Sequence, residues 1–483
     1  MNKTRWLTPL ILLLLLLPSS TIEGATLYVK QDGDGTDGES WETAYRTIGE
    51  ALDVVQLHDS IWVAEGTYEE RLTMPTSISL FGGFLGFEKS LGERAILAGE
   101  TVLDGTKFEE SILATNFNLF LDRFTFKNGS AHHGGAISCT YHTIEVVNCR
   151  FLENRCFTET QIRCPPDRPP AGPGGGYCVP LPISGKGSAA YLRYSVGIFE
   201  NCVFRDNRGD LSGGCIYSEH TNLILSETWF LDNNEPVLCE DNHALVIDEC
   251  VFERNRAPVI KTRNTSIDMF ETKVVGNRGY IGDKILEISS NSRMQNCLIA
   301  SNEVGQFGVI ISLRSNSNLD SIDSHDWKNC TIASNISDGS TVYDSWESQL
   351  NLSNVILWNK GKEIDAPTPT ITHSIVKGGH PGEGNLDLDP LFLDPENGNF
   401  HLSPDSPAID SATSTSLEFD LDGNRRPVDV IGVGNDGDSA FEIGCYEFQL
   451  MRSDLNSDGR VDEMDLMILQ RDWMKVSGAS GGG

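Results

Sequence analysis

The chain has 483 residues, with 37 lysine and arginine residues against 69 aspartate and glutamate residues, which gives a formal charge of −32 at pH 7. Such acidity argues against nucleic acid as a partner, because phosphate recognition requires clustered lysine and arginine side chains. The apolar fraction of 39%, with only 20 prolines, also excludes a disordered or collagen-like chain.

The N-terminus has the features of a secretory signal. Lys3 and Arg5 precede an apolar run over residues 10–17, which is too short to cross a bilayer. We therefore predict a signal peptide over residues 1–24, a secreted or cell-surface protein, and no transmembrane segment in the mature chain.

The middle of the chain is an array of repeats. Each unit has a small residue or a cysteine, a large apolar residue two positions later and an asparagine five positions after the first. From Cys202 onward the units start 26, 22, 22, 25, 33 and 25 residues apart. The clearest units are Cys149-Phe151-Asn154, Cys202-Phe204-Asn207, Thr228-Phe230-Asn233, Cys250-Phe252-Asn255, Thr272-Val274-Asn277, Cys297-Ile299-Asn302 and Cys330-Ile332-Asn335.

A period of 22 to 26 residues suits one coil of a parallel β-helix, in which three short strands alternate inward and outward side chains. The first two residues of each unit would point inward. The asparagine would stand at a corner, where it tolerates a left-handed backbone and bonds to the coils above and below. A β-propeller would need longer units. We therefore predict an all-β, right-handed parallel β-helix.

Five cysteines share one phase of the repeat. We expect them to pack mostly as free thiols in the core. The alternative is a disulfide ladder, because stacked coils place equivalent residues about 4.8 Å apart. Three more cysteines lie in a Pro/Gly-rich insertion over residues 156–186, where a disulfide would staple a loop without a core. These are Cys156, Cys164 and Cys178.

Catalytic signatures are weak. The Asn-Thr-Asp, Asp-Asp, Gly-His-Gly and Arg-Ile-Lys motifs of polygalacturonases are absent. Residues 241–243 and the set Asp320, Asp323, His325 and Asp326 have catalytic residue types, but solvated turns explain them equally well. His132 and His133 would face opposite sides of a strand, so we interpret them as a solvated turn. Lys261, Arg263 and Lys284 could act as bases, but nothing distinguishes them from ordinary surface cations.

The C-terminus carries an EF-hand-type calcium loop. Oxygen donors at loop positions 1, 3 and 5 converge on Ca²⁺, a glycine allows the sharp turn, and positions 7, 9 and 12 complete the shell. The alternative is an acidic turn before a helix. A second calcium site could form in the acidic closing segment, although the stretch from Asp420 to Asn424 lacks the full loop spacing; its candidate residues are Asp420, Asp422, Asn424, Asp429, Asp436 and Asp438. The predicted loop residues are Asp454, Asn456, Asp458, Gly459, Arg460, Asp462 and Asp465.

Several segments resemble known families. The Gly-Gly-Ala-Ile and Phe-x-x-Asn units, as at 134–137 and 151–154, resemble the repeats of chlamydial polymorphic outer-membrane proteins. Residues 41–68 resemble the opening of secreted parallel β-helix proteins, which implies a capping helix; residues 43–55 have suitable apolar spacing. Residues 454–473 resemble a single dockerin repeat, which implies Ca²⁺ binding and a cohesin-like partner.

These observations divide the chain into segments. They are a signal (1–24), an N-terminal cap and first coils (25–110), β-helix repeats (111–384), an acidic closing segment (385–450) that resembles those of bacterial surface β-helix proteins, a dockerin-type module (451–476) and a Gly/Ser tail (477–483).

Three functional hypotheses remain open. The first is an adhesive or carbohydrate-binding protein that holds a polysaccharide or another cell-surface polymer along its long side. The alternative is a polysaccharide lyase or glycoside hydrolase, which needs catalytic groups converging on one outward face. The third is a structural surface protein without a small ligand.

Overall fold

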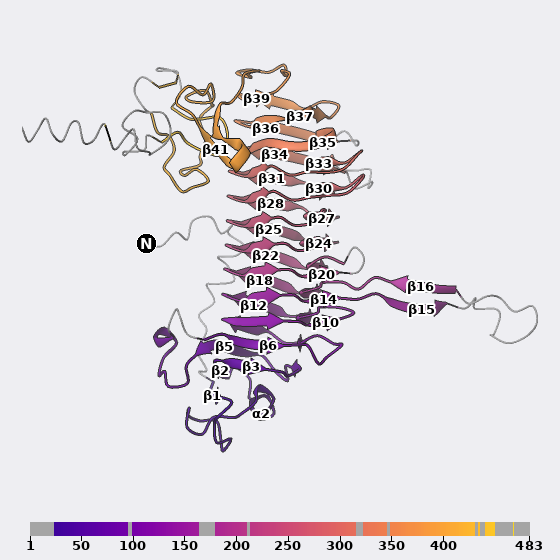
Figure 1. Cartoon of the computed structure of the whole chain (residues 1–483), viewed down its shortest axis with the longest axis vertical. Helices are drawn as coiled ribbons and strands as arrows, with labels where there is room; N and C mark the ends of the chain where they lie inside the picture. The colour runs from indigo at the N-terminus through magenta and orange to yellow at the C-terminus, as the bar shows by residue number, and fades with distance from the viewer. Residues whose placement is uncertain are drawn as a thin grey trace, which may run out of the picture.

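The computed structural model describes residues 24–94, 99–163, 179–209, 213–314, 322–344, 348–429, 433–434, 440–449 and 467. These residues form one long stack of β coils, with the N-terminal coil at the bottom of Figure 1 and the closing segment beside the upper coils. The predicted signal peptide up to residue 23, the calcium loop 454–465, Cys164 and Cys178 lie outside the described residues.

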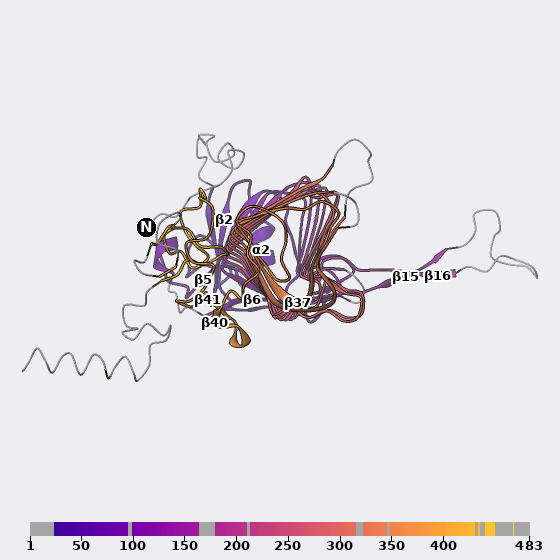
Figure 2. The ribbon, with the colours of Figure 1, turned by 90° about the horizontal axis from the view of Figure 1, so that it is seen from above.

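Each coil contributes strands to three parallel rows, which surround one core (Figure 2). The first row is a 13-stranded sheet. Its strands are β1 (Thr26–Val29), β2 (Ser60–Ala64), β5 (Ile78–Phe84), β8 (Leu119–Asp122), β12 (Thr143–Val147), β18 (Val196–Glu200), β22 (Asn222–Ser226), β25 (Ala244–Asp248), β28 (Ile267–Phe270), β31 (Ser292–Gln295), β34 (Ser324–Lys328), β36 (Gln349–Ser353) and β38 (Thr370–Thr372).

The second and third rows belong to one 21-stranded sheet, because the long strands β35 (Thr331–Asp344) and β37 (Ile356–Asp365) run through both. The second row also contains β3 (Gly66–Tyr68), β6 (Thr101–Asp104), β9 (Phe124–Lys127), β13 (Arg150–Leu152), β19 (Val203–Arg205), β23 (Trp229–Leu231), β26 (Val251–Glu253), β29 (Lys273–Val275), β32 (Leu298–Ala300) and β39 (Ile375–Val376). The third contains β4 (Leu72–Thr73), β7 (Leu113–Thr115), β11 (Ile137–Thr140), β17 (Ala190–Arg193), β21 (Ile216–Glu219), β24 (Val237–Glu240), β27 (Ile260–Arg263), β30 (Lys284–Ile288) and β33 (Val309–Leu313).

The remaining elements are short. Strands β10 (Ser130–Ala131), β14 (Arg155–Cys156) and β20 (Arg208–Gly209) form a small parallel sheet. Within the predicted insertion, β15 (Glu159–Arg163) and β16 (Val179–Ile183) pair as an antiparallel hairpin that projects from the stack in Figure 1. Strands β40 (Phe392–Asp394) and β41 (Asn399–Leu402) pair in the closing segment, and η1 (Leu91–Glu93) and η2 (Pro395–Asn397) are single 3₁₀ turns.

The predicted N-terminal helix is shorter than the sequence indicated. Only α2 (Ile48–Leu52) is α-helical, although the apolar spacing predicted residues 43–55. Its first turn is fixed by a capping box, in which the Thr47 side chain accepts a hydrogen bond from Glu50 N–H and the Glu50 carboxylate accepts one from Thr47 N–H. Ile48 and Ala51 are fully buried in the main core.

A buried asparagine ladder runs along one corner of the stack. The backbone N–H and the side-chain amide of Asn207 donate to Asn233 Oδ1 at 3.0 and 2.9 Å, and the amide also donates to Phe151 O at 2.9 Å. The same pattern recurs from Asn154 to Asn359, where the Glu363 carboxylate receives the last two donors at 2.6 and 2.8 Å. The predicted bonding of these asparagines between coils is confirmed.

The predicted backbone conformation of these asparagines is wrong. The left-handed residue is the one before each asparagine, such as Glu153, Asp206 or Asp232, with φ of 57°, 55° and 57°. The asparagine itself turns its amide into the stack, because the buried backbone donors of the neighbouring coil need an acceptor there.

Cysteine and phenylalanine side chains fill the core as predicted. Rings stack nearly parallel from coil to coil, with centroids 4.5 Å apart for Phe151 and Phe204 and 4.7 Å for Phe230 and Phe252. The cysteines of the repeat phase are buried free thiols, so no disulfide ladder forms among them. They are Cys149, Cys202, Cys250, Cys297 and Cys330.

The closing segment packs against the second row of strands near the C-terminal coils. Cys445 N–H donates to Thr331 Oγ1 at 3.1 Å, and Asn296 donates its amide to Phe419 O at 2.7 Å. Arg426 and Glu447 form a fully buried ion pair within the segment. These contacts hold the segment against the β-helix instead of leaving it as a separate unit.

The ladder makes Asn233 a sensitive position. We predict that Asn233→Ala lowers the free energy of unfolding by about 3 kcal/mol or more, because it leaves two buried donors of Asn207 without an acceptor. Urea unfolding measures the loss. The control is Asn234→Ala at the adjacent, half-buried position, and an equal small effect of both substitutions would contradict the role of the ladder.

Candidate functional site

Three aromatic residues occupy the same corner in successive coils, between the third and the first row. Tyr141, Tyr194 and His220 directly follow strands β11, β17 and β21, and their φ angles are 67°, 51° and 50°. This left-handed conformation costs an L-residue of that size about 1 kcal/mol or more. The next two coils place Asp241 and Asn264 there, which are residue types that adopt it more readily. We call the three aromatic residues the corner column.

The rings of the corner column stack along the axis of the β-helix. The centroids of Tyr141 and Tyr194 are 5.4 Å apart, and those of Tyr194 and His220 are 4.8 Å apart, with planes within 10° of parallel. Tyr141 is still 68% exposed and Tyr194 42%. Because the rings cover each other's faces, the column presents mainly its ring edges to solvent, together with the outer face of Tyr141 at its end.

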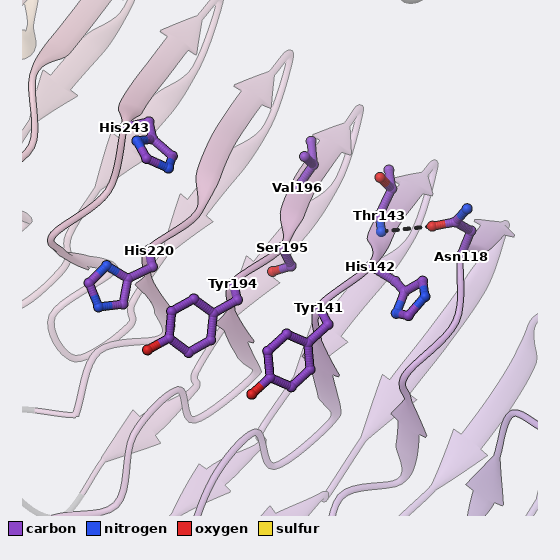
Figure 3. A pocket seen from close by; sticks show the side chains of 9 residues that line it. All are labelled: Asn118, Tyr141, His142, Thr143, Tyr194, Ser195, Val196, His220 and His243. Atoms are coloured by element: carbon purple, nitrogen blue, oxygen red, sulfur yellow. Dashed lines mark hydrogen bonds between the residues drawn. The ribbon is translucent and has the colours of Figure 1, made fainter.

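A hollow of about 480 Å³ runs beside the column (Figure 3). Asn118, Thr143 and Val196 line it near the starts of the first-row strands β8, β12 and β18, and Thr143 N–H donates to Asn118 Oδ1 at 3.0 Å. Five successive coils contribute to this corner hollow. Its lining is Asn118, Tyr141, His142, Thr143, Tyr194, Ser195, Val196, His220 and His243.

A charged face adjoins the hollow, on the outward side of the third row. Arg193 pairs with Glu219 at 3.2 Å, Arg263 with Glu240 at 3.1 Å, and Lys261 with Glu287 at 3.4 Å. The two outer cations at its ends are Lys186, 3.4 Å from Glu240, and Arg314, 3.1 Å from Glu287. Lysine, arginine and carboxylate groups therefore compensate one another along this face. Lys261 and Arg263, which the sequence did not distinguish, belong to it.

Two glutamates on the charged face have opposite pKa shifts. Burial raises the pKa of Glu235 to about 6. Burial also opposes ionisation of Glu240, but the Tyr217 hydroxyl, 2.5 Å from its carboxylate, and two neighbouring cations outweigh it and lower its pKa. Glu235 has a φ of 45° at a position where the three preceding coils have glycine, so its backbone is strained. Those glycines are Gly134, Gly187 and Gly214.

The predicted candidates at residues 241–243 do not converge. His243 is exposed and lines the corner hollow. Asn242 is buried, accepts a hydrogen bond from Thr221 N–H at 2.9 Å and donates to Ser218 Oγ at 2.6 Å. Asp241 accepts from the Asn264 amide. Only His243 of these three therefore belongs to the candidate site.

The second predicted set is divided between the core and the surface. His325 points into the core, where it is fully buried and lies 2.8 Å from Ser292 Oγ, whereas Asp326 pairs with Lys328 at 3.0 Å on the outside. Asp323 is buried and Asp320 lies outside the described residues. Alternation along β34 places His325 and Asp326 on opposite faces, so they cannot form one site.

The interpretation of His132 and His133 as a solvated turn is wrong. Their ring centroids are only 4.1 Å apart, and the His133 ring stacks on Tyr191 at 4.7 Å. Burial, and then the neighbouring charge of His132, lower the pKa of His133 to about 4. In the described part of the chain, no group of three or more histidine, cysteine or acidic side chains is arranged to hold a metal ion.

Around Asp420 and Asp422 the structure does not support the second calcium site, and Asp436 and Asp438 of the predicted set lie outside the described residues. The Asp420 carboxylate already accepts hydrogen bonds from the backbone N–H groups of Asp422, Asn424 and Glu447, and Asp422 lies 2.6 Å from His401 Nε2. These donors occupy the oxygens that a cation would need.

The buried His325 makes the stability of the protein pH-dependent. Burial lowers its pKa to about 4, whereas an unfolded histidine has a pKa near 6.5. Between these values the unfolded chain binds a proton that the folded chain does not, so the free energy of unfolding falls as the pH drops from 6.5 to 4.

We predict that this single group removes up to about 3 kcal/mol over that range. In the variant His325→Asn, the pH profile of unfolding should be flatter than in the wild type by that amount. Urea titrations at several pH values measure both profiles, and parallel curves would contradict this assignment.

Comparison with known proteins identifies the fold. The family described as "Right handed beta helix region" matches residues 182–285. Together with the parallel rows of strands, this match defines a right-handed β-helix protein. The comparison with curated proteins gave no match.

Among solved structures, pectate lyase Pel9A is 14% identical, with 90% of this chain and 98% of that chain covered and a TM-score of 0.38. A rhamnogalacturonan lyase is 11% identical, with coverage of 86% and 97% and a TM-score of 0.39. The GH136 lacto-N-biosidase from Eubacterium ramulus is 8% identical, with coverage of 72% and 68% and a TM-score of 0.24.

Within the described residues, no helix is long and apolar enough to cross a membrane.

Proposed function

We propose that this protein is a secreted or cell-surface β-helix protein that binds a carbohydrate polymer in the corner hollow and serves in adhesion. The observation that carries the proposal is the corner column, in which Tyr141 and Tyr194 remain exposed in a strained conformation in two successive coils and the half-buried His220 stacks on them from the third. Left-handed corners with bulky residues such as Arg123 and Arg254 occur elsewhere in the stack, so the strain gains its meaning from the stacked, exposed tyrosine rings that it accompanies here.

The chemistry of the hollow supports a carbohydrate. Tyrosine combines an apolar ring with a hydroxyl that donates and accepts hydrogen bonds, which matches the mixed apolar and hydroxyl surface of a sugar. Ser195, Thr143 and Asn118 add uncharged polar groups. The hollow lies along successive coils, and a solenoid offers an extended polymer such a surface.

The sequences at the two termini support the proposed location and add a calcium site to the proposal. The signal-like N-terminus implies export, and the resemblance to polymorphic outer-membrane proteins fits a surface location. The dockerin-like repeat would bind one Ca²⁺ through Asp454, Asn456 and Asp458, with positions 460, 462 and 465 completing the shell. The module would then attach the β-helix to a cohesin-like partner.

A polysaccharide lyase or glycoside hydrolase is the second candidate function. The charged face favours it, because Glu235 has a raised pKa while Glu287 is paired with Lys261 and Arg314. A carboxyl group with a raised pKa and a second carboxyl group held by cations are the usual arrangement of a general acid and its partner.

Asparagine readily adopts the left-handed backbone conformation of this corner, so the two tyrosine rings of the corner column can be replaced while the backbone is kept. We predict that the double variant Tyr141→Asn, Tyr194→Asn folds with unchanged stability to within about 1 kcal/mol, because lost ring stacking is offset by relief of left-handed strain. Its affinity for the bound polysaccharide should fall at least tenfold. A polysaccharide panel, with and without Ca²⁺, measures binding and any release of reducing or unsaturated ends.

Tyr280→Asn, at a 62% exposed tyrosine outside the hollow, is the matched control and should bind like the wild type. Unchanged binding by the double variant would contradict the proposal. Release of chain ends that Glu287→Gln abolishes would establish the second candidate function instead.

The calcium proposal has its own test. We predict that Asp454→Ala with Asp458→Ala removes one equivalent of bound Ca²⁺, because both side chains supply direct ligands in the EF-hand pattern. Isothermal titration calorimetry measures the stoichiometry, with Asp405→Ala, at an exposed aspartate of the closing segment, as the control. The same stoichiometry in the double variant and the wild type would rule the assignment out.

A further inference from the structure

The lining of the corner hollow contains no side chain with a permanent charge. Its nine residues are tyrosine, histidine, asparagine, serine, threonine and valine, without lysine, arginine, aspartate or glutamate. Apart from the imidazoles of His142, His220 and His243, the lining is therefore uncharged. It offers hydrogen-bond donors and acceptors and apolar rings, but no countercharge.

The cations nearest the hollow are already engaged. Arg193 lies over the Tyr194 ring at 5.0 Å and pairs with Glu219 at 3.2 Å. Arg263, in the strand before Asn264, pairs with Glu240. An acidic sugar would have to displace these carboxylates or remain unpaired, and an unpaired charge loses its hydration at a large cost when it enters a site.

The net charge of the whole chain also disfavours acidic ligands. Its formal charge of −32 produces a field that repels a polyanion, although salt screens this effect over distances beyond about 8 to 10 Å. Salt can therefore weaken the long-range repulsion, but it cannot supply the missing cation inside the hollow.

The stacking of the corner column determines the orientation of a bound ligand relative to the axis of the β-helix. The column repeats once per coil, and Figure 3 shows Tyr141, Tyr194 and His220 in a line that crosses neighbouring strands. A ligand that meets these ring edges in turn must lie along the axis of the β-helix. The outer face of Tyr141, which is 68% exposed, adds a platform at one end on which a sugar ring can stack.

We infer that the corner hollow takes a neutral glycan, lying along the β-helix axis, with its hydroxyl groups against the edges of the corner column and one sugar on Tyr141. This inference rests on the proposed function and narrows it, because it excludes polyuronates as the preferred ligand.

The experiment compares neutral and acidic oligosaccharides of equal length. Xylan, mannan and galactan fragments represent neutral glycans, and polygalacturonate and alginate fragments represent acidic ones. Binding is measured by calorimetry at pH 8, in 0.15 M and about 0.5 M salt, which changes the long-range repulsion but not the site. At least one neutral fragment should bind tenfold or more tightly than every acidic fragment at both salt concentrations.

Two variants identify the contacts. Tyr141→Phe with Tyr194→Phe keeps the ring stack and removes both hydroxyl groups, so binding of the neutral fragment should weaken about tenfold. Tyr141→Asn with Tyr194→Asn should abolish it, and Tyr280→Asn should leave it unchanged.

Three results would overturn the inference, and they are distinguishable. Tighter binding of an acidic fragment, lost in the asparagine variant, would refute the neutral ligand and leave the proposed site intact. Wild-type affinity of the phenylalanine variant for a neutral fragment would refute recognition through the ring edges. Absence of binding by every fragment, or binding that the asparagine variant retains, would refute both the inference and the proposed function.

Discussion

The structure depends on the constant spacing between coils, which the buried asparagine ladder fixes at one corner. Asn233, for example, accepts two hydrogen bonds from Asn207 in the preceding coil and donates two to Asn255 in the next coil, so a change in register would leave several buried polar groups unpaired at once. The stacked phenylalanines follow the same spacing, and the ladder ends where Glu363 supplies the last acceptor. Because the ladder keeps neighbouring coils aligned from Asn154 to Asn359, residues far apart in the sequence occupy equivalent places on the surface.

The candidate binding site is a consequence of that register. Tyr141 and Tyr194 are separated by the hairpin insertion, yet their rings lie 5.4 Å apart because their coils are adjacent. Five successive coils have a left-handed residue at this corner, and the two coils that follow the aromatic ones have Asp241 and Asn264 there. At Tyr141 and Tyr194 the stacking of the rings offsets the left-handed strain, and the rings provide a surface that a solvated turn would not provide.

The sequence predicted the fold better than the site, and the reason is physical. Inward alternation and the buried asparagine recur in the sequence because every coil must fill the same core, so the repeat unit was sufficient to predict the β-helix. The corner column was missed because its members are not alike and because the insertion separates the first two. A signal existed: Tyr141, Tyr194 and His220 each stand eight residues before the first residue of a repeat unit, at Cys149, Cys202 and Thr228. The stacking of His133 on Tyr191, and the ion pairs of Lys261 and Arg263, depend on packing between coils that no local pattern shows.

The central claim is that a glycan lies in the corner hollow along the β-helix axis, and a crystal structure of the protein with its tightest-binding oligosaccharide tests it most directly. The account predicts electron density for a sugar chain beside Tyr141, Tyr194 and His220, with one ring on the outer face of Tyr141 and hydroxyl groups within hydrogen-bond distance of the ring edges. Density on the charged face at Glu287, or on the exposed edge around Tyr280, with an empty corner hollow would contradict the account.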